Sequence, residues 1–416
     1  LETYPSSGIL NITLGKCYFE LGQIDLAISS YTKATEYWPQ SEVSYAKLGQ
    51  IYSSQGDTEQ AIKNLRKAVE LKPNDYELNS LLGGTLIQSG DFDAAIESLE
   101  QVLKIKPDYA EACFSMGSAL SAKGDLEGAI DSYKQAIKIN PDYIDAYNNM
   151  ALVLNDMSYF DAAIENFKLA LKINPNSCAA HNNMGIALHD KGEPDAAIDS
   201  YKRAIKLKPD YATAYNNMGR SLNKKGDFDA AIDSYNKALK IKPDCADTYT
   251  NIGNALHEKG NQEAAIESYK KAVQIKPDYA EAYNNMGAAL MDKGDPDAAI
   301  VSYKKALAIR PDYADTHRNL SKITIYTSEN SHFLEMQSLH QDKTLNDAAR
   351  CNLSFALAKA HEDLGESKKA FSYFSAGNAL RKKMLGYTID QDQNLFTSLR
   401  KAQPSILKHA LKSIAN

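Results

Sequence analysis

Small and hydrophobic residues recur along this chain with a period of 34 residues. Ten prolines mark the period, each one repeat length after the one before: Pro5, Pro39, Pro73, Pro107, Pro141, Pro175, Pro209, Pro243, Pro277 and Pro311. A period of this size predicts a stacked array, in which each short unit buries its apolar face against its neighbours. If the first unit begins at Gly8, nine full units occupy residues 8–313.

Each unit contains two stretches in which apolar and small residues recur at helical spacing. The first stretch places them at positions 4, 7, 8 and 11 of the unit, which in the seventh unit are Tyr215, Met218, Gly219 and Leu222. The second stretch places them at positions 20, 21, 24 and 27, which there are Ala231, Ile232, Tyr235 and Ala238. The small residues at positions 8, 20 and 27 predict that the two helices pack at close range.

The residues between the stretches predict where the helices end and begin. In the seventh unit Gly226 suits the left-handed end of one helix, and Asp227 suits the N-cap of the next. The fifth unit has Ser158 in place of the turn glycine, which indicates either a slightly different turn or a kink. Asp108 and Glu111 have the spacing of a capping box at the start of a first helix.

This pattern resembles the tetratricopeptide repeat (TPR), a helix–turn–helix unit of 34 residues with small residues at positions 8, 20 and 27 and proline at position 32. The resemblance implies an all-α fold, in which antiparallel helix pairs stack into a right-handed superhelical solenoid. It also implies that the first helices line a concave groove, and that the chain is a scaffold that binds a protein or an extended peptide.

The segments outside the nine units carry weaker patterns. Residues 1–7 match the last residues of a repeat and are expected to be the end of a truncated preceding unit. Residues 314–347 predict divergent helices, and residues 348–386 predict a degenerate TPR-like helix pair. Residues 387–416 predict short C-terminal helices with a mildly basic composition.

Composition narrows the classes of function. The formal net charge is −6 and the pI about 5.8, which argues against a dedicated nucleic-acid-binding protein, because such proteins carry a basic stripe. No apolar run is long enough to predict a membrane span. The five cysteines are scattered without metal-like spacing, which is typical of reduced thiols and predicts a cytoplasmic protein.

The sequence offers no constellation for catalysis. Phosphate-binding glycine loops, His-Glu-x-x-His and paired cysteine motifs do not occur. His181 and His189 share a predicted helix, but their spacing is too wide for a metal-binding i, i+4 pair. We therefore expect no enzyme activity within these residues, and neither a metal site nor a cofactor.

The strongest functional feature is a row of asparagines in the first helices. Position 6 is asparagine in six consecutive units: Asn149, Asn183, Asn217, Asn251, Asn285 and Asn319. Position 5 adds Asn148, Asn182, Asn216 and Asn284. Asparagine is a mediocre helix former, so its repeated use inside helices needs a reason. Its amide both donates and accepts, so a row at one-repeat spacing could hold the backbone of an extended peptide.

Two interpretations of this row stay open. In the TPR fold position 6 faces the groove, and a similar asparagine ladder occurs in the TPR arm of the O-linked N-acetylglucosamine transferases, where it holds peptide substrates. The alternative is structural, with the asparagines bonding between neighbouring repeats or to solvent. The first four units carry other residues at position 6, so a ladder would occupy only the later part of the groove.

A second resemblance concerns the end of the chain. Residues 352–396 resemble the segment that joins TPR arrays to the sulfotransferase domain of bacterial TPR–sulfotransferase proteins, although the phosphosulfate-binding loop of those enzymes does not occur here. This resemblance implies an alternative function, the substrate-recruiting arm of a larger transferase. A third hypothesis is an assembly scaffold that self-associates through its end repeats.

Overall fold

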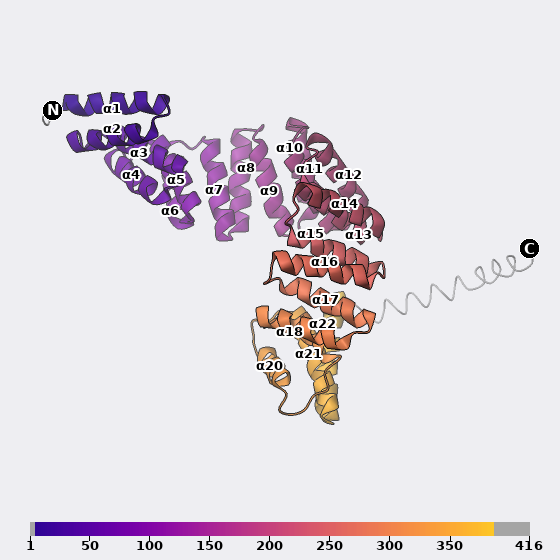
Figure 1. The fold of residues 1–416 in the computed structure, drawn as a ribbon. Coiled ribbons are helices and arrows are strands. Elements are labelled where there is room, and N and C mark those ends of the chain that lie inside the picture. The colour runs from indigo at the N-terminus through magenta and orange to yellow at the C-terminus, as the bar shows by residue number, and fades with distance from the viewer. Residues whose placement is uncertain (1–4, 387–416) are drawn as a thin grey trace, which may run out of the picture. The chain divides into compact units, whose positions relative to one another are not determined.

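The computed structural model describes residues 5–386, which form 22 α-helices and no strand (Figure 1). The prediction of an all-α fold of tandem helix pairs is therefore confirmed for this part of the chain. The chain divides into two compact units, Leu1–Ser221 and Leu222–Asn416, and the division falls within helix α13 (Ala212–Lys224). Each unit is described by itself.

The first unit contains six helix pairs that follow the 34-residue period. The first helices of the pairs are α1 (Pro5–Glu20), α3 (Glu42–Gln55), α5 (Tyr76–Ser89), α7 (Ala110–Lys123), α9 (Ile144–Asp156) and α11 (Cys178–Lys191). The second helices are α2 (Ile24–Tyr37), α4 (Thr58–Leu71), α6 (Phe92–Ile105), α8 (Leu126–Ile139), α10 (Phe160–Ile173) and α12 (Pro194–Leu207).

The second unit continues the period and then departs from it. Its regular helices are α14 (Phe228–Ile241), α15 (Ala246–Glu258), α16 (Gln262–Ile275), α17 (Ala280–Lys293) and α18 (Pro296–Ile309). Four irregular helices follow: α19 (Ala314–Ser321), α20 (Ser331–His340), α21 (Asp347–Asp363) and α22 (Ser367–Leu385). The short helices expected in residues 387–416 lie outside the described part of the chain.

The small residues explain how closely the helices of a pair approach. The alanine at position 20 is fully buried in all nine repeats: Ala27, Ala61, Ala95, Ala129, Ala163, Ala197, Ala231, Ala265 and Ala299. The glycine at position 8 lies directly against the side chain at position 24, which is a tyrosine ring in most repeats and a leucine in repeats two and three. A Cβ atom added at Gly253 would lie only 2.5 Å from the ring of Tyr269, so a larger residue there would force the helices apart.

The turns follow the expected chemistry in most repeats. Gly226 is left-handed with φ 81°, and the Asp227 carboxylate accepts a hydrogen bond from the backbone N–H of Ala230. Ser158 also adopts the left-handed conformation, with φ 63°, so the fifth repeat keeps its turn although it lacks the glycine. Because a side chain makes this conformation unfavourable, Ser158 is a strained substitute.

The predicted capping box is wrong at α7. The N-cap residue is Tyr109 rather than Asp108, and it makes no side-chain capping bond. The Tyr109 ring instead packs edge-on against Tyr76, with ring centroids 5.3 Å apart, and lies 4.9 Å from the Lys106 ammonium. The helix therefore begins one residue later than the capping box predicted.

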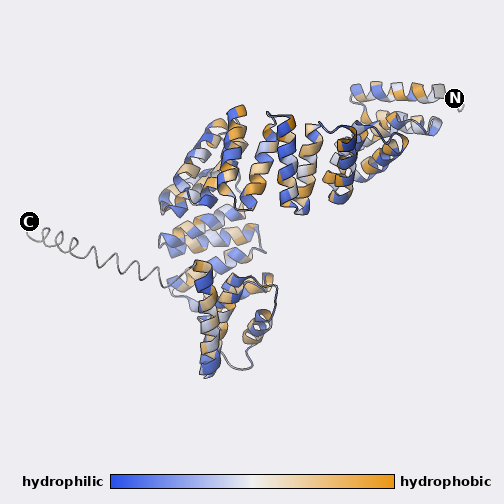
Figure 2. Ribbon diagram, turned by 180° about the vertical axis from the view of Figure 1, so that it is seen from behind, coloured by the Kyte–Doolittle hydropathy of each residue, from blue (hydrophilic) through white to orange (hydrophobic). Residues whose placement is uncertain are grey.

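The irregular helices of the second unit enclose a separate apolar core around Met336, Leu353 and Leu357. None of the described helices combines the length and hydrophobicity that crossing a membrane requires. Figure 2 shows polar and apolar residues interspersed along them, as expected for helices that bury one face.

Candidate functional site

The asparagines of the first unit form hydrogen bonds from one repeat to the next. First helices of successive repeats contact each other, as α9 does with α11. The Asn217 amide donates to the side-chain carbonyl of Asn182, one repeat earlier, over 3.1 Å. Asn182 in turn donates to the neighbouring Asn183 carbonyl over 3.2 Å. Positions 5 and 6 therefore act together along this face.

The second unit repeats the arrangement. Asn319 donates to Asn284 over 3.3 Å, and Asn284 donates to Asn285 over 3.1 Å. Asn285 donates to Asn254, at position 9 of the preceding repeat, over 3.0 Å. The sequence did not single out Asn254. The structural alternative for the row, bonding between neighbouring repeats, therefore has direct support at these residues.

Buried tyrosines give one physical reason for the asparagines. The Tyr269 hydroxyl reaches the first-helix face beside Gly253 and donates to the Asn254 carbonyl over 2.7 Å. Burial raises the pKa of the Tyr133 hydroxyl, which bonds to Ser118 and Asn149. A buried tyrosine hydroxyl needs such a partner.

The presence of asparagine at position 6 correlates in part with a tyrosine hydroxyl at position 24 of the preceding repeat. Repeats two and three carry Leu65 and Leu99 at position 24, and the repeats that follow them carry Leu81 and Ser115 at position 6. Asparagine appears at position 6 only after Tyr133 restores a hydroxyl. Two residues depart from the correlation. Phe167 has no hydroxyl and the next repeat still carries asparagine, whereas Tyr31 has one and the next repeat carries Lys47.

Exposure separates the asparagines into two groups. Asn182, Asn217 and Asn284 are buried, at 3%, 7% and 7% exposure. The others are half-buried: Asn148, Asn149, Asn183, Asn216, Asn251, Asn285 and Asn319. A partner lying on this face would reach the half-buried group directly, whereas the buried three would hold their neighbours in place.

A second line of polar contacts runs beside the asparagines. It joins position 12 of one repeat to position 13 of the next in four places: Ser53 to Gln88 (3.3 Å), Asn155 to Asp190 (3.2 Å), Asn223 to Glu258 (3.2 Å) and His257 to Asp292 (2.7 Å). These contacts fix the spacing of neighbouring first helices, and so the spacing of the groups between them.

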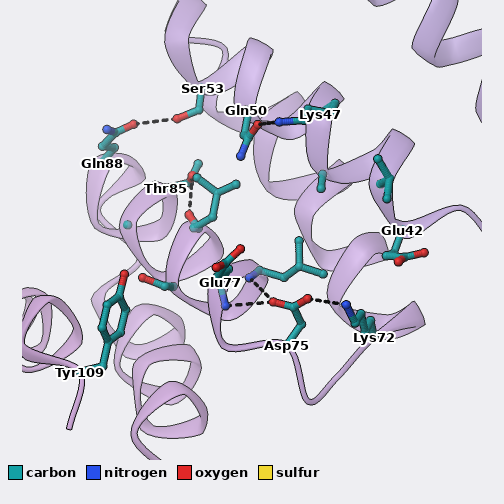
Figure 3. A pocket seen from close by; sticks show the side chains of 16 residues that line it. Glu42, Lys47, Gln50, Ser53, Lys72, Asp75, Glu77, Thr85, Gln88 and Tyr109 are labelled. Atoms are coloured by element: carbon teal, nitrogen blue, oxygen red, sulfur yellow. Dashed lines mark hydrogen bonds and ion pairs between the residues drawn. The ribbon is translucent and has the colours of Figure 1, made fainter. Parts of the chain in front are cut away.

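A hollow on this face lies before the asparagines begin. It is a cavity of about 610 Å³ between α3 and α5, and Figure 3 shows polar side chains at its edge. Ser53 and Gln88 span it, Lys47 bonds to Gln50 over 2.9 Å, and Gly84 leaves part of its floor open.

Sequence reasoning missed this hollow because it set aside the repeats that lack the asparagine. The available signal was Gly84, a glycine outside the repeating positions. A Cβ atom there would meet no atom within 4 Å, so packing does not require the glycine.

The described residues contain no group of three or more His, Cys, Asp or Glu side chains that could hold a metal ion. Their polar groups are amides, hydroxyls and paired charges. Chemically, such a face can form hydrogen bonds with another chain.

Four family models match the chain, under the descriptions TPR repeat and tetratricopeptide repeat. They cover residues 6–74, 52–113 and 280–313, and five overlapping segments between residues 117 and 294. The chain belongs to the tetratricopeptide repeat family. The matched residues of this TPR chain end at 313, so the likeness of its later residues to TPR–sulfotransferase proteins stays a prediction.

Two solved structures agree with the TPR fold. Yeast Tom70 is 16% identical, with a TM-score of 0.50 and coverage of 96% of both chains. A tetratricopeptide repeat protein from Parabacteroides merdae is 18% identical, with a TM-score of 0.51, and the match covers 60% of this chain and 99% of that one. MamA is 31% identical over 42% of this chain and 95% of its own, with a TM-score of 0.39. No curated protein sequence matches the chain.

Proposed function

We propose that this TPR chain is a protein-binding scaffold that holds extended segments of its partner along the first-helix face of each unit. The supporting observation is a run of half-buried asparagine amides at one-repeat spacing in each unit, Asn149 and Asn183 in the first and Asn251, Asn285 and Asn319 in the second, braced by bonds between repeats of 3.0–3.3 Å. An amide has two N–H donors and a carbonyl with two lone pairs, so one such bond does not exhaust it.

The half-buried asparagines have the direct role in this proposal. Asn149, Asn183, Asn251, Asn285 and Asn319 contact the partner backbone, and the buried Asn182, Asn217 and Asn284 hold the row in register. Asn148 and Asn216 lie one residue before position 6 and add contacts at its edge. Asparagines that bond to the partner's backbone tolerate varied partner side chains. The hollow between α3 and α5 would therefore supply the preference for one partner.

The test is selection from a random peptide library displayed on phage, using the full chain as bait. The comparison variant replaces Asn149, Asn183, Asn251 and Asn285 with alanine. We expect the native chain to enrich peptides whose affinity falls in the variant. If the peptides bind both proteins equally, the asparagines serve the fold alone and this proposal is wrong.

A matched control distinguishes asparagines that contact the peptide from asparagines that only bond to a neighbouring repeat. Asn254→Ala removes the inter-repeat partner of Asn285 and the acceptor of the Tyr269 hydroxyl, but leaves the Asn285 amide in place. It should preserve peptide affinity, and circular dichroism at 222 nm should show the same helicity in all variants. The transferase-arm and self-association hypotheses remain proposals of lower rank, because no contact among the described residues favours them.

A further inference from the structure

A second hollow lies on the side of the second helices, in the first unit. Its volume is about 650 Å³, and residues of α10, α11 and α12 line it. The repeat pattern fails here in three places, where Asn176, Ser177 and His181 stand at positions 33, 34 and 4. The preceding junction carries Asp142, Tyr143 and Tyr147 at the same positions. Two tyrosine rings and one carboxylate are therefore replaced by smaller, uncharged side chains.

Every charged residue that lines this hollow is a cation: Lys168, Lys172, Arg203 and Lys206. Lys168 is 3.4 Å from the Glu165 carboxylate. Within the described part of the chain, Lys172, Arg203 and Lys206 form no ion pair. Three uncompensated positive charges thus surround one cavity, in a protein whose net charge is −6.

Arg203 also lacks the ring that holds its counterparts. In two later repeats the lysine at position 26 lies over the tyrosine at position 4, with Lys271 5.6 Å from the Tyr249 ring and Lys305 5.5 Å from the Tyr283 ring. At this junction position 4 is His181, which instead bonds to the Pro175 carbonyl through Nε2 over 3.1 Å. The guanidinium is therefore available to a ligand from outside.

Neighbouring acids do not cancel this charge. A second cavity of about 540 Å³ adjoins the first and shares Lys168, Met184 and Arg203 with it. Its four carboxylates share three lysines: Asp161 and Glu193 bond to Lys191, Glu165 to Lys168, and Asp199 to Lys202. These pairs leave one negative charge against the three cations without an ion pair, so the net charge around the two cavities is positive.

Apolar side chains complete the hollow. Leu171, Met184 and Leu207 line it between the cations, and Leu207 is 40% exposed. An exposed leucine beside a cavity offers area to an apolar side chain from a partner. A guanidinium beside it can take a carboxylate in bidentate fashion.

We propose that this hollow, the basic pocket lined by Leu171, Lys172, Arg203, Lys206 and Leu207, docks an acidic segment of a partner protein that carries an apolar side chain. The apolar side chain seats against the leucines, and flanking carboxylates bind the cations. One pocket is too short to follow a nucleic acid, and the net charge of −6 repels a long polyanion. The second helices α10 and α12 supply the residues of this pocket, so binding here is independent of the asparagine face.

The experiment again uses a random phage-displayed peptide library and the full chain. Peptides are selected on the native protein and depleted on the variant Lys172→Gln/Arg203→Gln/Lys206→Gln. A second variant, Asn176→Asp/Ser177→Tyr/His181→Tyr, restores the residues of the preceding junction and fills the pocket. It should fold, because it reproduces a junction that this protein already builds.

The matched control removes three lysines at the same repeat positions elsewhere, as Lys138→Gln/Lys237→Gln/Lys240→Gln. We expect the depleted library to yield peptides with Asp or Glu around Leu or Phe. Their affinity should fall about tenfold in the charge variant, since each lost surface ion pair has a modest effect. It should fall similarly in the filled variant, and stay unchanged in the control and in the asparagine variant.

Three results would overturn the proposal. One is a depleted library without acidic apolar peptides. The other is equal binding to the native protein and the filled variant, which would place the peptides elsewhere. Loss of acidic peptides in the asparagine variant would also overturn it, because the first-helix face would then be their site.

Discussion

Acidification should destabilise the irregular helices of the second unit through a buried chain of hydrogen bonds. His317 donates from Nε2 to the Pro311 carbonyl over 2.7 Å, so its Nδ1 must accept. His332 therefore donates from Nε2 to His317 over 2.8 Å and accepts at Nδ1 from the Tyr326 hydroxyl over 2.8 Å. The bond between the two imidazoles requires a neutral His317, and the bond from the Tyr326 hydroxyl requires a neutral His332.

The pKa shifts agree with that geometry. Burial, followed by the charges of His317 and Lys304, lowers the pKa of His332 from 6.5 to about 3. Burial also lowers the pKa of His317, although its bond to Pro311 and the nearby Glu335 and Asp312 oppose the shift. Both histidines favour the folded state while they are neutral.

The sign and size of the effect follow from linkage. A histidine whose folded pKa is depressed contributes its full stability above the unfolded pKa of about 6.5, and loses it as the pH falls toward the folded value. For His332, with pKa values of 6.5 unfolded and about 3 folded, the free energy of unfolding drops by about 2 kcal/mol between pH 7 and pH 5.

The assay is hydrogen exchange of residues 314–386 at pH 7 and pH 5, corrected for the intrinsic exchange rate. His332→Gln is the comparison, because an amide can donate to His317 and accept from Tyr326 but does not titrate in this range. Between pH 7 and pH 5, the free energy of unfolding should fall by about 2 kcal/mol less in the variant than in the native protein. An equal pH-dependent loss in both proteins would refute the reasoning.

Three substitutions test the packing and the turns, each by urea unfolding. Gly253→Ala should destabilise by about 1–3 kcal/mol, because its Cβ would lie 2.5 Å from the Tyr269 ring. Gly84→Ala should instead stabilise by about 0.5–1 kcal/mol, since a Cβ there meets nothing within 4 Å. Ser158→Gly should stabilise by about 0.5–1 kcal/mol, because φ is 63° at that residue. The opposite sign in any of the three would contradict the packing described here.

The repeating residues made the fold predictable. Alanine stands at position 20 in all nine repeats and glycine at position 8 in eight of them, Ala151 being the exception, so one repeat describes the others well. The capping box failed because α7 begins one residue later than expected, with Tyr109 as its N-cap residue. The Tyr109 ring packs on Tyr76 of α5, a contact between two first helices that residue spacing does not show.

The candidate site was only partly predictable. The sequence located the asparagines but could not show that Asn285 bonds to Asn254, which depends on how two helices meet. It also gave no sign of the basic pocket until the departures at Ser177 and His181 were placed beside Arg203. Departures from a repeat carry the local function, and only the fold shows which of them come together.

The most direct test of the binding proposal compares two single variants with one selected peptide. The dissociation constant is measured by fluorescence anisotropy for the native chain, Asn285→Ala and Asn254→Ala. If Asn285 contacts the partner backbone, Asn285→Ala should weaken binding about 2- to 12-fold, the equivalent of one net hydrogen bond. Asn254→Ala should leave the dissociation constant unchanged. Equal weakening by both variants, or by neither, would contradict the account, because the asparagines would then only brace neighbouring repeats.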